Sequence, residues 1–298
     1  MNLDTHTIGT RPPLVLGATG RIGTGFQQLA QSGHWPGSPP VWQARRGAAL
    51  LSGTSLDWDI LTAPQPDPGH CHGIICLAGV INGDLALNTA LALAAIDLSR
   101  MTGCGPVLLC STAAVYGPAD SAVTEQAACH PQSDYGRAKL VMEQAVADKL
   151  RDLGALAPAV CILRIGNVAG ADALLGAAGR GRVGLDQFDD GHGPERSYIG
   201  PLDLARIMVQ LIDRLRHPLT VPPVLNVAAP QPVQMAALLQ AAGADWNWRP
   251  APVHALRRMV LDTTKLYSLV VPFALSDHPA ELIRQSRLAG WAPAGAAA

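Results

Sequence analysis

The stretch Leu14-Val-Leu-Gly17-Ala-Thr-Gly20-Arg-Ile-Gly23 decides the fold of this chain. A short apolar run leads directly into glycines spaced three residues apart, where a predicted helix begins. Glycine permits a tight turn and close approach of the backbone, and the first N–H groups of the helix face an anion. The turn therefore predicts a site for the phosphates of a dinucleotide, with an ordinary tight turn as the alternative. The residues predicted to contact the dinucleotide here are Gly17, Thr19, Gly20, Arg21, Ile22 and Gly23.

Short apolar runs alternate with longer Ala- and Leu-rich stretches from residue 13 to 165. This alternation is typical of βαβ units, which build a parallel sheet. Beyond residue 170 the pattern loosens into Gly-rich segments before a helix at 202–215, a strand at 224–227 and a helix from 233. Upstream, the predicted strands are 13–16, 40–43, 73–77, 107–110 and 159–163, and the predicted helices are 21–32, 84–101 and 134–153.

These elements predict an α/β fold with a Rossmann-type doubly wound parallel sheet. We expect residues 12–168 to form a dinucleotide-binding domain, to which segments around 196–228 return. We expect residues 169–298 to form a smaller, irregular and mostly helical substrate-binding part.

Composition excludes several classes of protein. With 298 residues, 48% hydrophobic and 15% charged, the chain has enough apolar surface to fold as a globule. Its net charge of −1 offers no general attraction for nucleic acid or an anionic membrane. The longest apolar stretch, 85–96, is interrupted and shorter than the roughly 18 residues of a membrane span. The N-terminus lacks the pattern of a secretory signal, so we expect a cytoplasmic protein.

The six cysteines make no CxxC pair and no zinc-like spacing with histidine. We predict that they are buried free thiols and that the protein holds no metal. His70-Cys71-His72 is accordingly interpreted as a polar loop before a strand rather than as a metal site. The cysteines are Cys71, Cys76, Cys104, Cys110, Cys129 and Cys161.

The end of the second predicted strand bears on cofactor choice. In dinucleotide-binding folds an acidic residue there holds the ribose 2′-hydroxyl of NAD, whereas arginine accommodates the 2′-phosphate of NADP. Here the chain has Gln43-Ala44-Arg45-Arg46, which contains no carboxylate. The sequence therefore favours NADP over NAD, with Arg21 as a further phosphate contact. The alternative is that Arg45 and Arg46 are merely solvated.

A tyrosine and a lysine lie four residues apart in Tyr135-Gly-Arg-Ala-Lys139, on one face of a predicted helix. A phenol titrates at about 10, too high for an efficient base at neutral pH, and a nearby cation lowers that pKa. The chain has only three lysines and four tyrosines, so this spacing is informative. A surface Tyr–Lys pair is the alternative.

Two hydroxyl residues, Ser111 and Thr112, end a buried strand. The carboxyl edge of an α/β sheet is where ligands bind, so these side chains are candidates to hydrogen-bond a substrate carbonyl or alcohol. Hydroxyl residues at strand ends also serve simply as turn formers.

These elements in this order resemble the extended branch of the short-chain dehydrogenase/reductase superfamily, the NAD(P)-dependent sugar epimerase/dehydratase family. The likeness covers roughly residues 13–290. Asp59-Ile60 resembles the family's acidic–aliphatic pair that contacts adenine. Cys76-Leu77-Ala78-Gly79 resembles the strand end that lines the nicotinamide, and Asn88 begins a similar helix. Later matches are Arg164-Ile-Gly-Asn167-Val168, Arg196-Ser-Tyr-Ile199, Leu225-Asn226-Val227 and Asp262-Thr-Thr-Lys265.

The resemblance implies a role for each matching residue. Tyr135 would be the acid/base, while Lys139 would hold the nicotinamide ribose and depress the tyrosine pKa. Thr112, with Ser111 behind it, would polarise the reacting oxygen while a hydride passes between substrate and nicotinamide. Asn167 would touch the substrate's sugar or phosphate, and Arg196 would pair with a nucleotide diphosphate.

Several positions depart from the family pattern. The tyrosine that usually follows Asn-Val is Ala169, the usual His-Val-Asp is Gly200-Pro201-Leu202, and the aspartate after the arginine is Ser197. The 4,6-dehydratases carry an Asp-Glu pair for elimination where this chain has Ala113 and Ala114. Dehydration is therefore disfavoured. The segment that forms the substrate-binding part is also short compared with that of nucleotide-sugar epimerases. A smaller carbonyl compound is therefore an alternative substrate.

We therefore expect an NAD(P)-dependent epimerase or reductase that acts on a sugar-like or other small carbonyl or alcohol compound. The sequence does not separate these two outcomes. The alternative is a non-catalytic NADP-binding sensor or regulator, which the presence of both Tyr135 and Lys139 disfavours. By resemblance, helices 84–101 and 134–153 pair across a homodimer; no nucleic acid, membrane or metal partner is expected.

Overall fold

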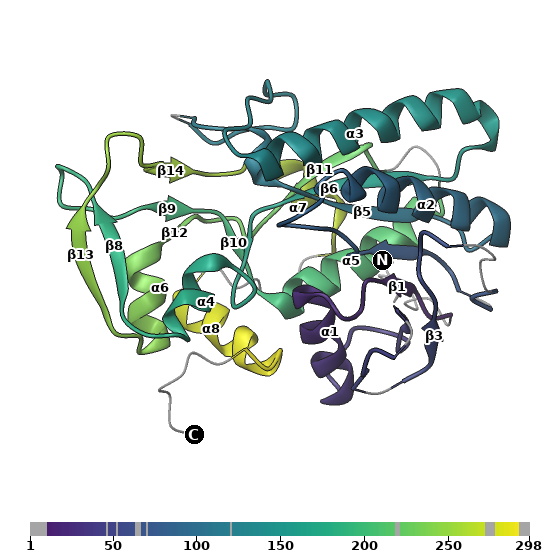
Figure 1. The fold of residues 1–298 in the computed structure, drawn as a ribbon, viewed down its shortest axis with the longest axis horizontal. Helices are drawn as coiled ribbons and strands as arrows, with labels where there is room; N and C mark the ends of the chain where they lie inside the picture. The colour runs from purple at the N-terminus through teal and green to yellow at the C-terminus, as the bar shows by residue number, and fades with distance from the viewer. Residues whose placement is uncertain are drawn as a thin grey trace, which may run out of the picture. The chain divides into compact units, whose positions relative to one another are not determined.

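The computed structural model of the chain contains a seven-stranded sheet with the strand order β11-β6-β5-β4-β1-β2-β3 (Figure 1). This order and the parallel pairing of β1 with both β2 and β4 confirm the predicted doubly wound α/β fold. The structure describes residues 11–45, 47–51, 53–62, 67–69, 71–119, 121–217, 221–271 and 278–291, so Arg46 and His70 lie outside the described residues. The strands are β1 (Leu14–Leu16), β2 (Val41–Ala44), β3 (Ser55–Asp57), β4 (Ile74–Cys76), β5 (Val107–Thr112), β6 (Val160–Ile165) and β11 (Val224–Val227).

The chain divides into two compact units. Unit 1 comprises Met1–Cys110, Val141–Ile162 and Ala205–Pro223, and unit 2 comprises Ser111–Leu140, Leu163–Leu204 and Val224–Ala298. The long helices are α1 (Arg21–Gln31), α2 (Leu87–Thr102), α3 (Asp134–Leu153) and α5 (Pro201–Leu215).

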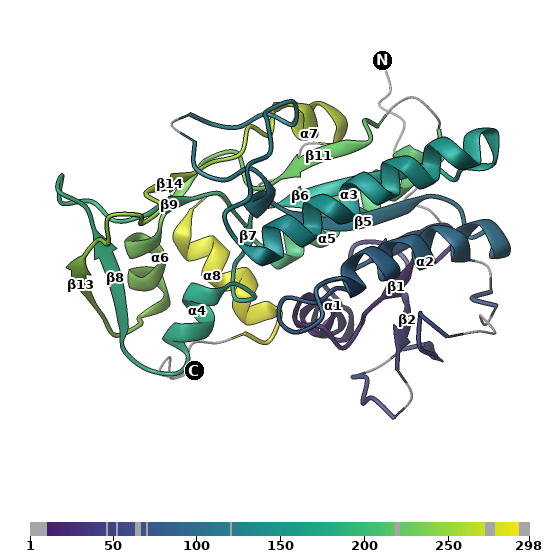
Figure 2. The same ribbon diagram turned by 45° about the horizontal axis from the view of Figure 1, so that its top comes forward.

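Strands β1, β2 and β4 of unit 1 are buried on both faces, as strands inside parallel sheets are. All of β1 and β4 is buried, which is why these strands read as unbroken apolar runs in the sequence. The Lys149 ammonium of α3 lies 2.9 Å from an Asp97 carboxylate oxygen of α2, and the two helices run side by side in Figures 1 and 2. The strand order reverses between β1 and β4, and ligands bind outside the carboxyl ends of strands at such a switch point.

Unit 2 has short strands and helices around its own core. Ala169, Leu238 and Leu282 are among the buried side chains of that core. Helices α6 and α8 lie beside each other, and a parallel ladder joins β8 to β13 (Figure 2). The strands are β7 (Asn167–Val168), β8 (Val183–Gln187), β9 (Glu195–Arg196), β10 (Tyr198–Ile199), β12 (Val233–Gln234), β13 (Trp246–Pro250) and β14 (Arg258–Met259), and the helices are α4 (Ala173–Ala178), α6 (Met235–Ala242), α7 (Thr264–Leu269) and α8 (Pro279–Leu288).

In the described part of the chain, no helix combines the length and the apolar character needed to cross a membrane. All six cysteines are free thiols, as predicted, although Cys110 and Cys129 are only partly buried.

Candidate active site

The glycine turn after β1 has the shape of a phosphate cradle. Gly17 has a φ of +81°, and a Cβ at this position would lie 2.6 Å from the backbone nitrogen of Ala78. A Cβ on Gly23 would lie 2.5 Å from the carbonyl oxygen of Ala18. The N-cap of α1 is Gly20, so no cap side chain occupies the first-turn N–H groups. These groups can therefore donate to an anion at the positive end of the helix.

Two buried glutamines make hydrogen bonds to the backbone of this turn. The Gln43 side chain accepts from the Gly17 N–H at 2.9 Å and donates to the Trp58 carbonyl. The Gln27 side chain donates to the Ala18 carbonyl at 2.7 Å. Neither role was predicted from the sequence, although a glutamine within an apolar strand such as Gln43 is a signal for a buried polar contact. Because Gln43 is bonded on both sides, its amide belongs to the scaffold of the turn.

The other predicted cofactor residues of unit 1 surround this turn or follow the neighbouring strands. Arg21 and Arg45 are exposed, the first opening α1 and the second directly after β2. Asp59 is half-buried and accepts from the Leu61 N–H at 3.0 Å. The segment after β4 lies against Gly17 through Ala78. The remaining members are Ile60, which is buried, Leu77, which is half-buried, and Gly79, which is exposed.

The loop after β4 is fixed by Asn88, which is 1% exposed. Its side-chain amide donates to the Val80 carbonyl at 2.9 Å and accepts from the Val80 N–H at 3.1 Å. The asparagine that opens the predicted helix therefore orders the segment containing Leu77–Gly79.

The proposed acid/base pair lies in unit 2, in the first turns of α3. The Lys139 ammonium is 5.9 Å from the centroid of the Tyr135 ring. Lys139 is only 4% exposed, whereas Tyr135 is half-buried. The structure thus brings the phenol and the cation together on one helix face, as the four-residue spacing predicts.

The two hydroxyl residues end β5 in the same unit. Ser111 is buried and Thr112 half-buried. The Thr112 hydroxyl oxygen accepts from the Ala114 N–H at 3.2 Å and so caps the short 3₁₀ turn Ala113–Val115.

Gly136 governs how closely α3 approaches that turn. A Cβ on Gly136 would lie 2.5 Å from the Ala114 carbonyl oxygen and 3.0 Å from the Pro131 Cβ. Only glycine permits this approach. The residue beside Tyr135 therefore packs directly against the turn that follows Thr112, a positioning contact that the sequence analysis missed.

Asn167, predicted to contact substrate, takes part in a buried cluster. Its side chain shares a hydrogen bond with Tyr198, whose hydroxyl donates to the Asp172 carboxylate at 3.0 Å. Burial raises the pKa of the Asp172 carboxyl, and burial together with the Asp172 charge raises the pKa of Tyr198. Asp172 also accepts from the N–H groups of Leu174 and Leu175 as the N-cap of α4.

Arg196, the second predicted substrate contact, uses part of its guanidinium on the main chain. Its Nη1 donates to the carbonyls of Glu195 at 2.8 Å and Arg257 at 3.0 Å, and Nη2 donates to the carbonyl of Leu256. Burial lowers the pKa of this arginine. These three contacts fix β9 against the segment leading into β14. They use three of the five guanidinium N–H groups, and the other two are on Nε and Nη2.

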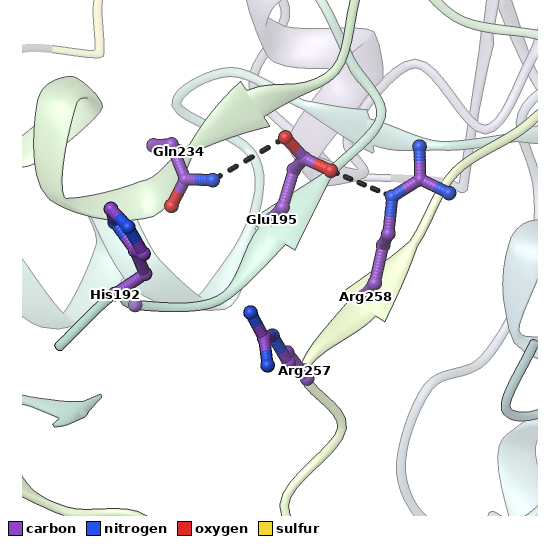
Figure 3. A pocket seen from close by; sticks show the side chains of 6 residues that line it. His192, Glu195, Gln234, Arg257 and Arg258 are labelled. Atoms are coloured by element: carbon purple, nitrogen blue, oxygen red, sulfur yellow. Dashed lines mark hydrogen bonds and ion pairs between the residues drawn. The ribbon is translucent and has the colours of Figure 1, made fainter. Parts of the chain in front are cut away.

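A cavity of about 270 Å³ lies in unit 2 and is lined in part by Glu195 of β9 and Arg258 of β14 (Figure 3). One Glu195 carboxylate oxygen accepts from Arg258 Nε at 2.8 Å and the other accepts from the Gln234 amide at 3.3 Å. The lining of this cavity is polar, which suits a ligand rich in hydroxyl or charged groups. The lining residues are His192, Gly193, Glu195, Gln234, Arg257 and Arg258.

Three of the family-like segments meet in one buried polar cluster. Asn226 of β11 donates through its side chain to the carbonyls of Val123 at 2.9 Å and Asp262 at 3.0 Å, and accepts from the Tyr116 hydroxyl at 2.6 Å. Burial raises the pKa of Tyr116 to about 12. The Arg164 guanidinium lies over the Tyr116 ring, 4.8 Å from its centroid.

Glu125 completes the cluster from the other side. Its carboxylate accepts from the Asn226 N–H at 3.1 Å and lies 3.1 Å from the Lys265 ammonium. The side chain of Glu125 is 5% exposed, whereas that of Lys265 is 41% exposed. The segments containing Arg164, Asn226 and Lys265 therefore hold the scaffold of unit 2 together.

Replacing Asn226 by alanine should destabilise the fold. The Asn226→Ala variant removes the acceptor of the buried Tyr116 hydroxyl and the side-chain donor to two carbonyls, of which that of Val123 keeps the Asp262 N–H, so the free energy of unfolding should fall by about 2 kcal/mol. Urea unfolding measures this value. Asn247→Ala, which removes an exposed local hydrogen bond, is the control and should change it by less than about 0.5 kcal/mol. A loss for Asn226→Ala as small as that of the control would contradict the structural role.

Two of the departures from the family pattern, Gly200 and Ala169, have a packing explanation in α8. A Cβ on Gly200 would lie 2.1 Å from the Gln285 side-chain oxygen, and one on Gly170, which matches the pattern, would lie 2.2 Å from the Ser286 hydroxyl. Ala169 is fully buried in the same core as Leu282. Small residues stand at these positions because α8 occupies the space that larger side chains would take.

No group of three or more His, Cys, Asp or Glu side chains that could hold a metal ion occurs among the described residues.

Comparison with known proteins places the chain in a family. The pattern of the NAD dependent epimerase/dehydratase family matches residues 80–228, half of the chain. No curated protein sequence matches it. Among solved structures, the UDP-Glc/GlcNAc 4-epimerase of Campylobacter jejuni superimposes with a TM-score of 0.74 at 18% identity, covering 94% of this chain and 99% of that one.

Two further structures share the fold. The UDP-glucose 4-epimerase of Brucella ovis, solved in complex with NAD, gives a TM-score of 0.71 at 21% identity and covers 92% of this chain and 97% of its own. An NAD-dependent NDP-hexosamine 5,6-dehydratase of tunicamycin biosynthesis gives 0.72 at 19% identity, with coverage of 94% and 97%. At these identities the structures establish the fold, and the family match adds the class. The chain belongs to the NAD dependent epimerase/dehydratase family of enzymes.

Proposed function

We propose that this enzyme moves a hydride between the nicotinamide of NAD(P) and a carbon of a nucleotide sugar or a similar carbonyl or alcohol compound. The observation that carries the proposal is the Tyr135–Lys139 pair, with the ammonium 5.9 Å from the phenol ring centroid. Relatives of the same fold are described as UDP-sugar epimerases, which supports a nucleotide-sugar substrate.

The glycine turn fits the cofactor. The positive φ of Gly17 and the close approach of the Ala78 backbone exclude any side chain at position 17 and keep the turn tight. The uncapped first turn of α1 supplies N–H donors for the cofactor's phosphates. We propose that unit 1 holds the dinucleotide through the residues around this turn, and that residues 169–298 supply most of the substrate contacts.

The chain's own residues supply the proton chemistry. When bound, the nicotinamide provides the hydride acceptor or donor. Tyr135 takes the proton from the substrate hydroxyl as the carbon is oxidised and returns it when the carbonyl is reduced. Lys139 places a positive charge beside the phenol and donates to the ribose hydroxyls. Thr112, supported by Ser111, donates a hydrogen bond to the reacting oxygen.

The proposed reaction contains no elimination step. Ala113 and Ala114 follow Thr112 directly, and neither methyl side chain can transfer a proton. An epimerase would return the hydride to the other face of the same carbon, whereas a reductase would release the oxidised cofactor after each turnover.

On the substrate side we propose that Asn167 and Arg196 orient the polar part of the substrate. The remaining guanidinium donors of Arg196 suit a diphosphate. The neighbouring polar cavity around Glu195 and Arg258 is proposed to take hydroxyl groups of the same ligand.

An Arg196→Lys variant should raise KM more than it lowers kcat, because lysine cannot reproduce the planar fork of donors.

A cofactor-dependent activity screen tests the proposed function. Purified protein is incubated with NAD(H) or NADP(H) and a panel of UDP-, dTDP- and GDP-sugars and simple carbonyl compounds. Absorbance at the nicotinamide band detects net reduction, and proton NMR detects epimers formed without net redox change. Binding of the cofactor with no turnover of any panel member would favour the sensor alternative.

We further propose a preference for NADP over NAD. Arg45 is exposed directly after β2, and the Gln43 side chain at the strand end is bonded to Gly17 and Trp58. Arg45→Ala should weaken NADPH binding about tenfold by removing a charge-assisted contact and leave NADH binding unchanged. Quenching of intrinsic tryptophan fluorescence measures both affinities.

The control for this variant is Arg151→Ala, which removes an exposed arginine at the far end of α3 and should change neither affinity. Tighter binding of NADH than of NADPH by the unaltered protein would contradict the preference.

We also propose a homodimer formed through α2 and α3. Met101 and Val141 expose 70% and 55% of their surface on these helices. Small-angle scattering should give the mass of a dimer, and a monomer at all concentrations would remove this proposal.

A further inference from the structure

A second cavity, of about 500 Å³, lies in unit 1 near the amino ends of β4, β5 and β6. It is lined by the residues just before β4, by the turn that joins α2 to β5 and by the residues before β6. Ligands of open α/β sheets bind at the opposite, carboxyl ends of the strands. The proposed hydride-transfer chemistry therefore does not use this cavity.

Two cysteines line the cavity and contact each other. Cys71 is 6% exposed and Cys104 is 2% exposed, and their thiols share a hydrogen bond. The Cys71 thiol also donates to the Pro68 carbonyl at 3.2 Å, and the Cys104 sulfur lies 3.9 Å from the Gly73 carbonyl. Both thiols thus have fixed positions at one wall of the cavity.

The backbone holds the two cysteine segments together. Gly105, next to Cys104, has a φ of +93°, and a Cβ there would lie 3.0 Å from the carbonyl oxygen of His72. The Ile74 N–H donates to the Pro106 carbonyl at 2.8 Å. The segments 71–74 and 104–106 are therefore in close contact, which keeps Cys71 and Cys104 beside each other.

The two thiols differ in acidity. The hydrogen bond from Cys104 lowers the pKa of Cys71, whereas that bond and burial raise the pKa of Cys104. A thiolate is the nucleophilic form of cysteine, so Cys71 is the thiol that reacts first.

His72 lies at the same wall. Its side chain is 4% exposed, and neither ring nitrogen makes a hydrogen bond, although Nε2 lies 3.4 Å from an Asp213 carboxylate oxygen. The contact lacks hydrogen-bond geometry, and the imidazole lines the cavity.

We propose that Cys71 and Cys104 form a reversible dithiol–disulfide site that a hydroperoxide oxidises through this cavity. Cys71 attacks one oxygen of hydrogen peroxide as its thiolate, the O–O bond breaks, and the leaving hydroxide takes up the thiol proton as water while Cys71 becomes a sulfenic acid. The Cys104 thiol then attacks the Cys71 sulfur, the S–OH bond breaks, and a second water leaves as the disulfide forms. In sum two thiols are oxidised by two electrons and one peroxide is reduced to two waters.

The disulfide would close the segment from Cys71 to Cys104, which contains β4 and α2. Such a closure restricts the unfolded chain and should raise the melting temperature by about 5 °C. Dithiothreitol should reverse the rise.

Oxidation of the full-length protein with hydrogen peroxide tests the proposal. The reduced protein is treated with peroxide, remaining thiols are alkylated after unfolding, and the peptides are mapped by tandem mass spectrometry. The expected result is a Cys71–Cys104 cross-link with loss of two hydrogen atoms. Alkylated Cys71 and Cys104, or a cross-link between other cysteines, would overturn the proposal.

Variants separate the order of the steps. Cys104→Ser should leave a sulfenic acid on Cys71 that dimedone traps, and Cys71→Ser should give neither cross-link nor adduct at this pair. Cys161→Ala, which alters another buried cysteine of unit 1, is the matched control and should still form the cross-link. A dimedone adduct on Cys104 in Cys71→Ser, equal in rate to that on Cys71, would contradict the assigned roles. Because the unaltered protein is mapped directly, the test does not depend on any variant folding.

Discussion

Replacing Tyr135 by phenylalanine should lower kcat by about 10²- to 10⁴-fold, the usual contribution of a positioned acid or base. The change removes one hydroxyl and retains the ring that lies against the Lys139 ammonium. Phenylalanine cannot exchange a proton with the substrate oxygen, so the loss should fall on kcat, with cofactor affinity unchanged. Steady-state rates on the substrate found in the screen, combined with a fluorescence titration of the cofactor, measure the two quantities separately.

Tyr267→Phe is a matched control because it also removes one phenolic hydroxyl from unit 2. That hydroxyl donates to the Ala228 carbonyl, and we place no chemistry on it. The control should keep kcat within about twofold, at a stability cost of about 1 kcal/mol for the lost hydrogen bond. Full turnover by Tyr135→Phe would show that another group carries the proton. An equal loss in both variants would show that the effect arises from the fold.

The sequence predicted the parts of the fold that are buried on both faces. A short run of apolar residues such as β1 is readily predicted as a buried strand. Helix α3 was predicted with its observed bounds because its apolar positions repeat at helical spacing. Strand β3, Ser55–Asp57, was missed. It has three residues, two of them exposed, at the edge of the sheet, so it carries neither an apolar run nor a readable alternation.

In the candidate site, too, some residues could be predicted from the sequence and others could not. A motif shows which residue types recur at a given spacing, and Tyr135 with Lys139 follows directly from helix geometry. Contacts between distant segments leave no such local signal. The approach of Gly136 to Ala114 and the clamp of Gln43 on Gly17 are of this kind.

The departures from the family pattern show why substrate residues are the hardest to predict. In the sequence Gly200 only departs from the family pattern, whereas in the structure its neighbour is Gln285, which is distant along the chain. Only the packing of α8 shows that a small residue is needed at this position because a helix side chain lies against it. Residues that face a ligand and residues that face a distant helix look alike until the helix is placed.

Adding one methyl group at Gly17 should both destabilise unit 1 and abolish cofactor binding. Alanine would have to adopt a φ of +81°, and its Cβ would lie 2.6 Å and 2.7 Å from the backbone nitrogen and Cα of Ala78. The left-handed conformation costs about 1 kcal/mol and the overpacking about 2 kcal/mol, so the free energy of unfolding should fall by about 3 kcal/mol. The melting temperature should fall by about 8 °C.

Gly33→Ala separates the two causes. Gly33 also has a positive φ, +74°, but a Cβ there meets no atom within 4 Å. It should therefore show only the conformational cost, about 1 kcal/mol, and keep its affinity for the dinucleotide. In Gly17→Ala the backbone of Ala78 cannot retreat without moving the segment after β4, so the phosphate cradle opens and affinity should fall at least about a hundredfold. If both variants bound NADPH equally well, the glycine turn would not be the phosphate site, whatever their stabilities.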